Sequence, residues 1–348
     1  MHEFQDQNNS MLKRILVLVV PIILLIGTTA SFAQSKEVQF YIDTCITIMK
    51  KNAVNSPQVD WAALKASIQK EAAGINDMYQ LGTVIKHLYQ ALNDFHGAFY
   101  YKDSVFGWHR QRHAISDSIM NEWKKGVTNK ARVLENNIGY LRIPSMPYNG
   151  KEGVDKKATL LNDSLCWLLS HQVKGIIIDA RLDGGGAMFP MILGLKQLLP
   201  EGKQGSFTAK TGETWYIKGN DFLLDTNILT SLQHTCNMDA QQVPVVILIG
   251  PGTGSSGEFF IMPFKTRPHT LLMGTETAGY ITSVAGFPIN DAAQINLSTG
   301  YGADKNGNVY KQALQPDIIL TGEDSFNNLA KDLKVKAAVK WLMQQLSL

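Results

Sequence analysis

The stretch VPVVILIG at residues 243–250 runs directly into PGTGSSGEFFIMPFK at residues 251–265. The first part is an apolar run typical of a buried strand, and the second begins as a glycine-rich turn that opens a helix. Ser255 lies in this turn. A serine at a strand-to-helix junction exposes its hydroxyl beside the N–H groups of the helix N-terminus, which can stabilise an oxyanion. The pattern therefore favours nucleophilic catalysis by Ser255.

Strands and helices alternate on the N-terminal side of this junction. Apolar runs predict strands at 138–143, 175–179 and 243–249, and helical periodicity predicts helices near 155–170 and 187–199. Such alternation predicts an α/β core. We expect helices from Glu37 to Leu92, with Asp60 as one N-cap, and an amphipathic helix over 327–346. Residues 101–130 are expected to form a polar connector, and residues 200–242 an irregular stretch.

A second glycine-rich turn, Asp183 to Gly186, follows the predicted strand 175–179. Its glycines allow a close approach of the backbone to a ligand, and its free N–H groups could face a developing oxyanion. The alternative is an ordinary glycine turn. A histidine, His96, ends the helical region, but the chain has eight histidines, and His109 and His113 lie nearby. Spacing alone does not choose among them.

Other functional classes are weakly supported. Residues 252–257 fit the pattern GxGxxG, and Glu276 lies near the distance expected of a ribose-binding acid. Too few residues follow for the rest of a dinucleotide-binding fold. A phosphate-binding loop is excluded because no lysine precedes Ser255. The net charge of +3 gives no electrostatic reason to expect nucleic acid or an anionic membrane as a partner.

The N-terminus has the pattern of a secretory signal peptide. Lys13 and Arg14 precede an apolar run over 15–27, and small residues lead to an expected cleavage site after Ala33. We expect residues 1–33 to be removed, which leaves a periplasmic or secreted protein with no stable membrane span. The alternative is an uncleaved anchor, which the short apolar run disfavours.

The three cysteines, Cys45, Cys166 and Cys236, are widely spaced and form no metal-binding pattern. We expect buried thiols, or one oxidised pair after export.

Six segments in a fixed order resemble a serine peptidase family that includes the tail-specific (C-terminal-processing) proteases, the tricorn protease core and the interphotoreceptor retinoid-binding protein modules. The segments and the family patterns that they resemble are 94–97 (Asp-x-His-Thr), 137–146 (the strand IGYLRIPSF), 179–186 (DLRxNxGG), 253–258 (TxSxxE), 274–279 (GxxTxG) and 315–318 (xPDI). Each is modest alone, but the ordered set is specific, and the resemblance runs from about Val59 to Ile319.

The resemblance implies a Clp protease/crotonase-like α/β core with a helical N-terminal subdomain. We expect the subdomain over 34–104, a connector over 105–130, and the peptidase core with its C-terminal helix over 131–348. A peptide-binding PDZ module needs roughly a hundred residues. Too few residues separate His96 from Asn137 to hold one, so none is expected.

The resemblance also implies roles for individual residues. Ser255 would be the nucleophile and His96 the general base. The N–H of Gly185 or Gly186, together with that of Ser256, would form the oxyanion hole. No metal or organic cofactor is implied.

Two positions depart from the family pattern. Tyr280 stands where the tail-specific branch has a lysine base, so the tricorn-like Ser–His arrangement is the better match. Tyr310 stands where that tricorn-like branch has an orienting glutamate. Asp94, Glu258 or Glu276 could orient His96 instead, and the sequence does not choose among them.

The sequence thus predicts an exported serine-type peptidase that hydrolyses a peptide or polypeptide through an acyl-enzyme. The alternative is a catalytically inactive module of the same fold that binds a peptide or an apolar ligand. Neither the substrate nor the oligomeric state follows from the sequence.

Overall fold

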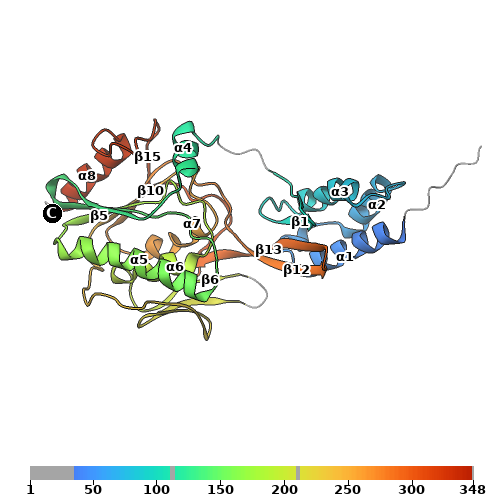
Figure 1. Cartoon of the computed structure of the whole chain (residues 1–348), viewed down its shortest axis with the longest axis horizontal. Helices are drawn as coiled ribbons and strands as arrows, with labels where there is room; N and C mark the ends of the chain where they lie inside the picture. The colour runs from blue at the N-terminus through green and yellow to red at the C-terminus, as the bar shows by residue number, and fades with distance from the viewer. Residues whose placement is uncertain (1–34, 110–113, 209–211, 347–348) are drawn as a thin grey trace, which may run out of the picture.

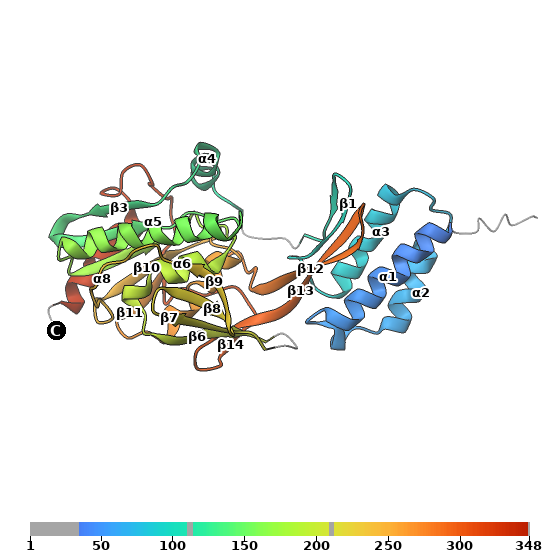
Figure 2. The ribbon, with the colours of Figure 1, turned by 60° about the horizontal axis from the view of Figure 1, so that its bottom comes forward.

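The computed structural model describes residues 35–109, 114–208 and 212–346. The expected signal peptide, residues 1–33, lies outside this part of the chain. Two lobes lie along the long axis of the molecule, as Figures 1 and 2 show. The larger lobe holds most of the strands, and the smaller one holds the N-terminal helices. The paired strands β12 (Thr282–Asn290) and β13 (Ala293–Asp304) extend from one lobe into the other.

A mainly parallel sheet lies at the centre of the larger lobe. Its strands, in spatial order, are β15 (Ile318–Ile319), β11 (Thr270–Gly274), β10 (Val245–Ile249), β5 (Gly175–Asp179), β4 (Ile138–Arg142) and β3 (Lys130–Val133). Only the β3–β4 pair is antiparallel. The three strands expected from sequence are β4, β5 and β10, so the predicted α/β core is confirmed.

Helices cover both faces of this sheet. Ile176 and Ile178 of β5 pack with α5 (Lys151–Ser170) and α6 (Met188–Gly194), whereas Ile177 packs with α8 (Leu333–Gln345) on the other face. Successive side chains of a strand point to opposite faces, so a continuous apolar strand fits a sheet that is covered on both sides. The C-terminal helix begins at Leu333, after the position expected, because Asp332 caps its first turn.

A second, largely antiparallel sheet holds nine strands within the described residues. Its main path is β2 (Ser104–Phe106), β1 (Ala98–Tyr101), β13, β6 (Gly202–Phe207), β7 (Thr214–Lys218), β8 (Asp221–Leu224) and β9 (Asn227–Ser231), with β12 and β14 (Val309–Tyr310) also paired to β13. Strand β13 pairs with β1 near its start and with β6 near its end. It therefore belongs to both lobes.

The smaller lobe is built on α1 (Lys36–Asn52), α2 (Trp61–Glu71) and α3 (Met78–Ala91), with the short helix η1 (Ser56–Gln58) between the first two. Ser35, Asp60 and Asp77 cap the three long helices. Apolar side chains of these helices share one core with Phe99 of β1 and Ile295 of β13. The C-terminal half of the sequence thus completes the core of the N-terminal lobe. The subdomain limits 34–104 stay a prediction.

Two segments contain more structure than the sequence indicated. The expected irregular stretch between 200 and 242 is wrong, because it holds β6 to β9. These strands are short and mostly half-exposed, so they lack a continuous apolar signal. The polar connector contains β2 and α4 (Asp117–Lys125). Helix α4 is short, and its N-cap at Ser116 and its one buried side chain, Ile119, are local signals that sequence reasoning missed.

The remaining short helices are η2 (Glu135–Asn137), η3 (Lys196–Leu198), α7 (Ser256–Phe259) and η4 (Met262–Thr266). A disulfide joins Cys166 of α5 to Cys236, and Cys45 is a buried thiol. In the ranges 35–109, 114–208 and 212–346, no helix has both the length and the apolar character that a membrane crossing requires.

Candidate active site

Two turns meet at the carboxyl ends of β5 and β10. The parallel register pairs Asp179 with Leu248, so the chain leaves both strands at the same edge of the sheet. The N–H of Gly254 donates to the carbonyl of Asp183 at 2.9 Å, and the hydroxyl of Thr253 donates to the carbonyl of Ala180 at 2.8 Å. These bonds hold the turn that carries Ser255 against the glycine turn 183–186.

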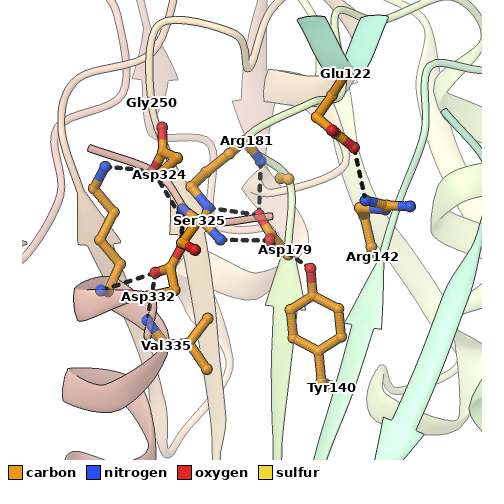
Figure 3. A network of polar contacts seen from close by, with 12 residues as sticks. Glu122, Tyr140, Arg142, Asp179, Arg181, Gly250, Asp324, Ser325, Asp332 and Val335 are labelled. Carbon is orange, nitrogen blue, oxygen red and sulfur yellow. Dashed lines mark hydrogen bonds and ion pairs between the residues drawn. The ribbon is translucent and has the colours of Figure 1, made fainter. Parts of the chain in front are cut away.

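A buried ion cluster anchors the glycine turn (Figure 3). The Arg181 guanidinium, 1% exposed, binds Asp179 at 2.7 Å and Asp332 at 2.9 Å, and it also binds Asp324 at 2.7 Å. The hydroxyl of Tyr140 donates to Asp179 at 2.7 Å. Burial would raise the pKa of Asp179, but Arg181 outweighs burial and holds this pKa below its usual value.

The cluster links distant parts of the chain. Asp332 caps α8, Arg181 precedes the glycine turn, and both side chains are buried. Arg181 also lies over the ring of Phe326, with its guanidinium carbon 4.7 Å from the ring centroid. The C-terminal segment thereby fixes the point at which the glycine turn begins. No signal in the sequence connected Asp324 or Asp332 with this turn.

Ser255 has a strained backbone. Its φ is 54° and its ψ is −121°, a conformation that costs a non-glycine residue about 1–3 kcal/mol. The buried carboxylate of Glu258 accepts the N–H of Ser255 at 2.9 Å and that of Gly279 at 2.9 Å, and it also accepts the hydroxyl of Thr277. Glu258 therefore supports the turn that presents the serine hydroxyl at the start of α7.

His96 lies beside Ser255. Its Nε2 is 3.2 Å from Oγ of Ser255, and its Nδ1 is 3.0 Å from Oγ1 of Thr282. The ring of Tyr280 packs on the imidazole with 4.8 Å between the ring centroids. Both ring nitrogens are thus held, and the structure brings together the serine and the histidine that the sequence singled out.

A chain of hydroxyl groups continues from His96 to a buried carboxylate. Oγ1 of Thr282 lies 2.8 Å from Oγ of Ser298, whose hydroxyl donates to Oδ1 of Asp94 at 2.7 Å. Asp94 also accepts the N–H groups of His96, Gly97 and Ser298. Asp94 is 4% exposed and accepts hydrogen bonds from four donors. Sequence reasoning missed Thr282 and Ser298, because only the β12–β13 pairing brings them to His96.

Two other acids lie elsewhere around the site. Glu276 accepts a hydrogen bond from Gln315 at 2.6 Å, and Glu258 supports the Ser255 turn. Tyr310, at the position of the family glutamate, donates its hydroxyl to Asp304 at 3.0 Å. The group at Nδ1 of His96 is the hydroxyl of Thr282, and Asp94 is joined to it through Ser298.

The N–H groups of the glycine turn differ in their partners. That of Gly184 donates to Ser145 at 2.8 Å, and that of Gly185 donates to Asp183 at 3.0 Å. Among the described residues, the N–H groups of Gly186 and Ser256 donate no hydrogen bond. The hydroxyl of Ser256 donates to the carbonyl of Gly186 at 2.6 Å and holds these two residues together.

Pockets open on both sides of His96. One has a volume of about 570 Å³ and reaches Ser255, Ser256 and Gly186. Its apolar lining includes Ala187, Met188, Phe189, Phe207, Leu224, Leu229 and Phe259, together with part of β12. The other, of about 530 Å³, is more polar and includes Asn55, Glu276, Lys311 and Gln315. His96 and Thr282 line both pockets.

A strained serine between a strand and a helix, with an imidazole beside it, is the arrangement of a serine hydrolase. A family model described as Peptidase family S41 matches residues 137–320, which is more than half of the chain. The chain therefore belongs to peptidase family S41. It is thus a member of a family of serine peptidases, as the sequence resemblance predicted.

Individual proteins are also similar to this chain. The nisin-resistance protein of Lactococcus lactis subsp. lactis is 27% identical over 223 residues, which are 64% of this chain and 65% of that protein. The match thus spans slightly less than two thirds of the curated relative. A lipoprotein from Streptococcus agalactiae is 21% identical, with a TM-score of 0.65 over 88% of this chain and 96% of its own. The photosystem II D1 C-terminal processing protease is 12% identical, with a TM-score of 0.52 over 82% of this chain and 93% of its own.

At these identities, the two solved structures bear on the fold alone. They support the expected Clp protease/crotonase-like core. The expected lack of a PDZ module and the Ser–His branch stay predictions.

Proposed function

We propose that this chain is a serine-type peptidase that hydrolyses peptide bonds through an acyl-enzyme, with Ser255 as nucleophile and His96 as general base. The observation that carries the proposal is the 3.2 Å approach of Nε2 of His96 to Oγ of the strained Ser255. Serine is a weak nucleophile until a base removes its proton, and this distance permits direct transfer.

The hydroxyl chain sets the tautomer of His96. Because the Ser298 hydroxyl donates to Asp94, its oxygen is left to accept from Thr282, and Thr282 is then left to accept from Nδ1–H. Nε2 is then unprotonated and can accept the Ser255 proton. When His96 becomes an imidazolium, the same chain orients its second N–H bond toward the buried negative charge.

The reaction then follows from the positions of the groups. Oγ of Ser255 attacks the carbonyl carbon of the peptide bond while Nε2 of His96 takes the proton. The oxyanion of the tetrahedral intermediate accepts the N–H groups of Gly186 and Ser256, since that of Gly185 is held by Asp183. His96 protonates the leaving amine as the C–N bond breaks, and water then hydrolyses the acyl-enzyme with His96 again as the base.

The pocket beside Ser255 supports a preference for an apolar side chain in the substrate. Its apolar lining lies next to Gly186 and Ser256, where the acyl carbonyl would be held. Burial of a Leu- or Phe-sized side chain contributes about 1.5–3 kcal/mol. Because a curated relative is named a nisin-resistance protein, nisin is a first substrate to test.

We also propose that the protein works outside the cytoplasm. The Cys166–Cys236 disulfide supports this location, because such bonds persist in oxidising compartments.

The proposal is tested by labelling the protein with a fluorophosphonate and sequencing the modified peptide. We expect label on Ser255 that is lost in Ser255→Ala and strongly reduced in His96→Ala. His109→Ala removes a nearby histidine on the connector. It serves as a control and should keep the label. Full labelling of Ser255→Ala would refute the mechanism.

The second candidate is a binding module of the same fold without turnover. The neutral hydroxyl of Thr282 at Nδ1 of His96 favours it, because peptidase triads place an acid there. Folded protein that takes no label and binds peptides without cleaving them would select this alternative.

A further inference from the structure

A buried carboxyl lies behind the two proposed oxyanion donors. Asp183 is fully buried and begins the glycine turn. Its Oδ1 accepts the N–H of Gly185 at 3.0 Å, and its carbonyl accepts that of Gly254 at 2.9 Å. A Cβ atom added to Gly257 of α7 would lie only 3.0 Å from Cγ of Asp183. The carboxyl is therefore packed between the glycine turn and the helix that follows Ser255.

The other oxygen of this carboxyl, Oδ2, is buried and has no hydrogen-bond partner among the described residues. The contrast with the other buried acids near the site is informative. Asp94 accepts four hydrogen bonds, and Asp179 binds the guanidinium of Arg181. An ionised carboxylate that is buried with one N–H donor and no cation costs far more than a neutral carboxyl with one unpaired O–H.

Within the described ranges, no basic side chain pairs with Asp183. The nearest basic side chain in sequence, Arg181, is bound to Asp179, Asp324 and Asp332. On α7, which packs against the carboxyl, the charged group is Glu258, whose sign matches that of an ionised Asp183. On α4, Glu122 pairs with Lys125 and Arg142. Burial raises the pKa of Asp183 well above its usual value, and only the Gly185 N–H opposes this shift.

We propose that Asp183 is a positioning residue of the oxyanion turn that works as the neutral carboxylic acid, and that its ionisation switches the site off. In the neutral form, Oδ1 holds the N–H of Gly185, which leaves the N–H of Gly186 to face the substrate carbonyl. Ionisation places a negative charge behind the donors that must stabilise an oxyanion, and it drives the carboxyl toward water.

This inference rests on the proposed function and predicts a bell-shaped pH dependence. Activity rises with pH as His96 loses its proton and becomes a base. Activity falls again at higher pH, as the carboxyl of Asp183 loses its proton. The fall belongs to Asp183, so it should disappear when the side chain cannot ionise.

The experiment measures the second-order rate constant of fluorophosphonate labelling of Ser255 in the full-length protein. The pH is varied from 5 to 10, a range chosen to include the titration of both His96 and Asp183. Asp183→Asn keeps an acceptor for Gly185 and cannot ionise. We expect it to label at the wild-type maximum and to lose the alkaline fall. Asp183→Ala removes the acceptor, and we expect labelling at least about tenfold slower at every pH. Asp304→Asn, at a buried acid with several donors, should keep the wild-type profile.

Two labelling results would overturn the proposal: labelling of Asp183→Asn as slow as that of Asp183→Ala, or an unchanged alkaline fall in Asp183→Asn. Circular dichroism spectra recorded on each variant ensure that only folded protein is compared.

Urea unfolding tests the carboxyl independently of catalysis, and so separates failure of this inference from failure of the proposed function. The folded-state pKa is raised, so the folded protein holds its proton longer than the unfolded chain. Wild-type stability, relative to Asp183→Asn, should therefore fall as pH rises from the unfolded pKa to the folded one. The unfolding equilibrium constant should change by up to about tenfold per pH unit. If the difference in unfolding free energy between wild type and Asp183→Asn does not change between pH 5 and 9, the inference is overturned, even if Ser255 takes no label.

Discussion

The hydroxyl of Thr282 lies 3.0 Å from Nδ1 of His96, at the position where serine peptidases commonly hold an acid. Beyond it, Ser298 and Asp94 complete a path to a buried negative charge. The carboxylate of Asp94 is thus two hydroxyl groups away from His96. In the proposed mechanism, this path orients His96 but stabilises its imidazolium less than a direct contact with an acid would.

The Thr282 hydroxyl is expected to matter for rate. Thr282→Val keeps the shape of the side chain but removes the hydrogen bond to a group that becomes charged, which is worth about 1.5–3 kcal/mol. We predict a fall of about 10- to 100-fold in the labelling rate or in kcat, with little change in KM. Thr282→Ser, the matched control, should stay close to wild type. Equal rates in Thr282→Val and wild type would remove Thr282 from the mechanism.

The buried ion cluster should be essential for stability. Arg181→Met leaves Asp179 and Asp332 buried without their cation, and breaking such a buried pair costs about 3–5 kcal/mol. Urea unfolding at neutral pH measures this loss. Lys265→Met, which removes an exposed pair with Asp317 at 3.6 Å, should cost less than about 1 kcal/mol. Similar losses in both variants would contradict the role given to the cluster.

The disulfide should stabilise the larger lobe. Cys166 and Cys236 are 70 residues apart in sequence, and a loop of this size predicts a loss of about 2–5 kcal/mol when the bond is removed. We expect Cys166→Ala/Cys236→Ala to unfold at lower urea than wild type. Dithiothreitol should destabilise wild type and leave the double variant unchanged.

Burial raises the pKa of the Cys45 thiol, so Cys45 should not react with a thiol reagent until the protein unfolds.

The apolar pocket should select the side chain on the acyl side of the cleaved bond. Leu229 lines this pocket beside Ser255, and Leu229→Lys places a positive charge in it. We predict that cleavage of a peptide library shifts from apolar to acidic residues at this position. Ile228→Lys is the matched control, because Ile228 neighbours Leu229 on β9 but is exposed and does not line this pocket. An unchanged preference in Leu229→Lys would mean that the substrate side chain on the acyl side binds outside this pocket.

Much of the core was predictable from local signals. The strands β4, β5 and β10 are continuous apolar runs, and the N-cap at Asp60 and the turn at Ser255 follow from residue type at short spacing. Strands β6 to β9 were not predictable, because they are short and mostly half-exposed and become strands by pairing with one another and, for β6, with β13.

The sequence by itself determined the α/β core, the family and the choice of Ser255 and His96 for the candidate site, because apolar runs, glycine turns and ordered motifs consist of neighbouring residues. Only the tertiary structure decided what surrounds them. Strand β13 carries Ser298 to Asp94, and β12 carries Thr282 to His96, over separations of 204 and 186 residues. The burial that leaves Oδ2 of Asp183 without a hydrogen-bond partner among the described residues is also a property of packing. Contacts between side chains so far apart depend on strand register and on the closing of the core, and no local pattern records them.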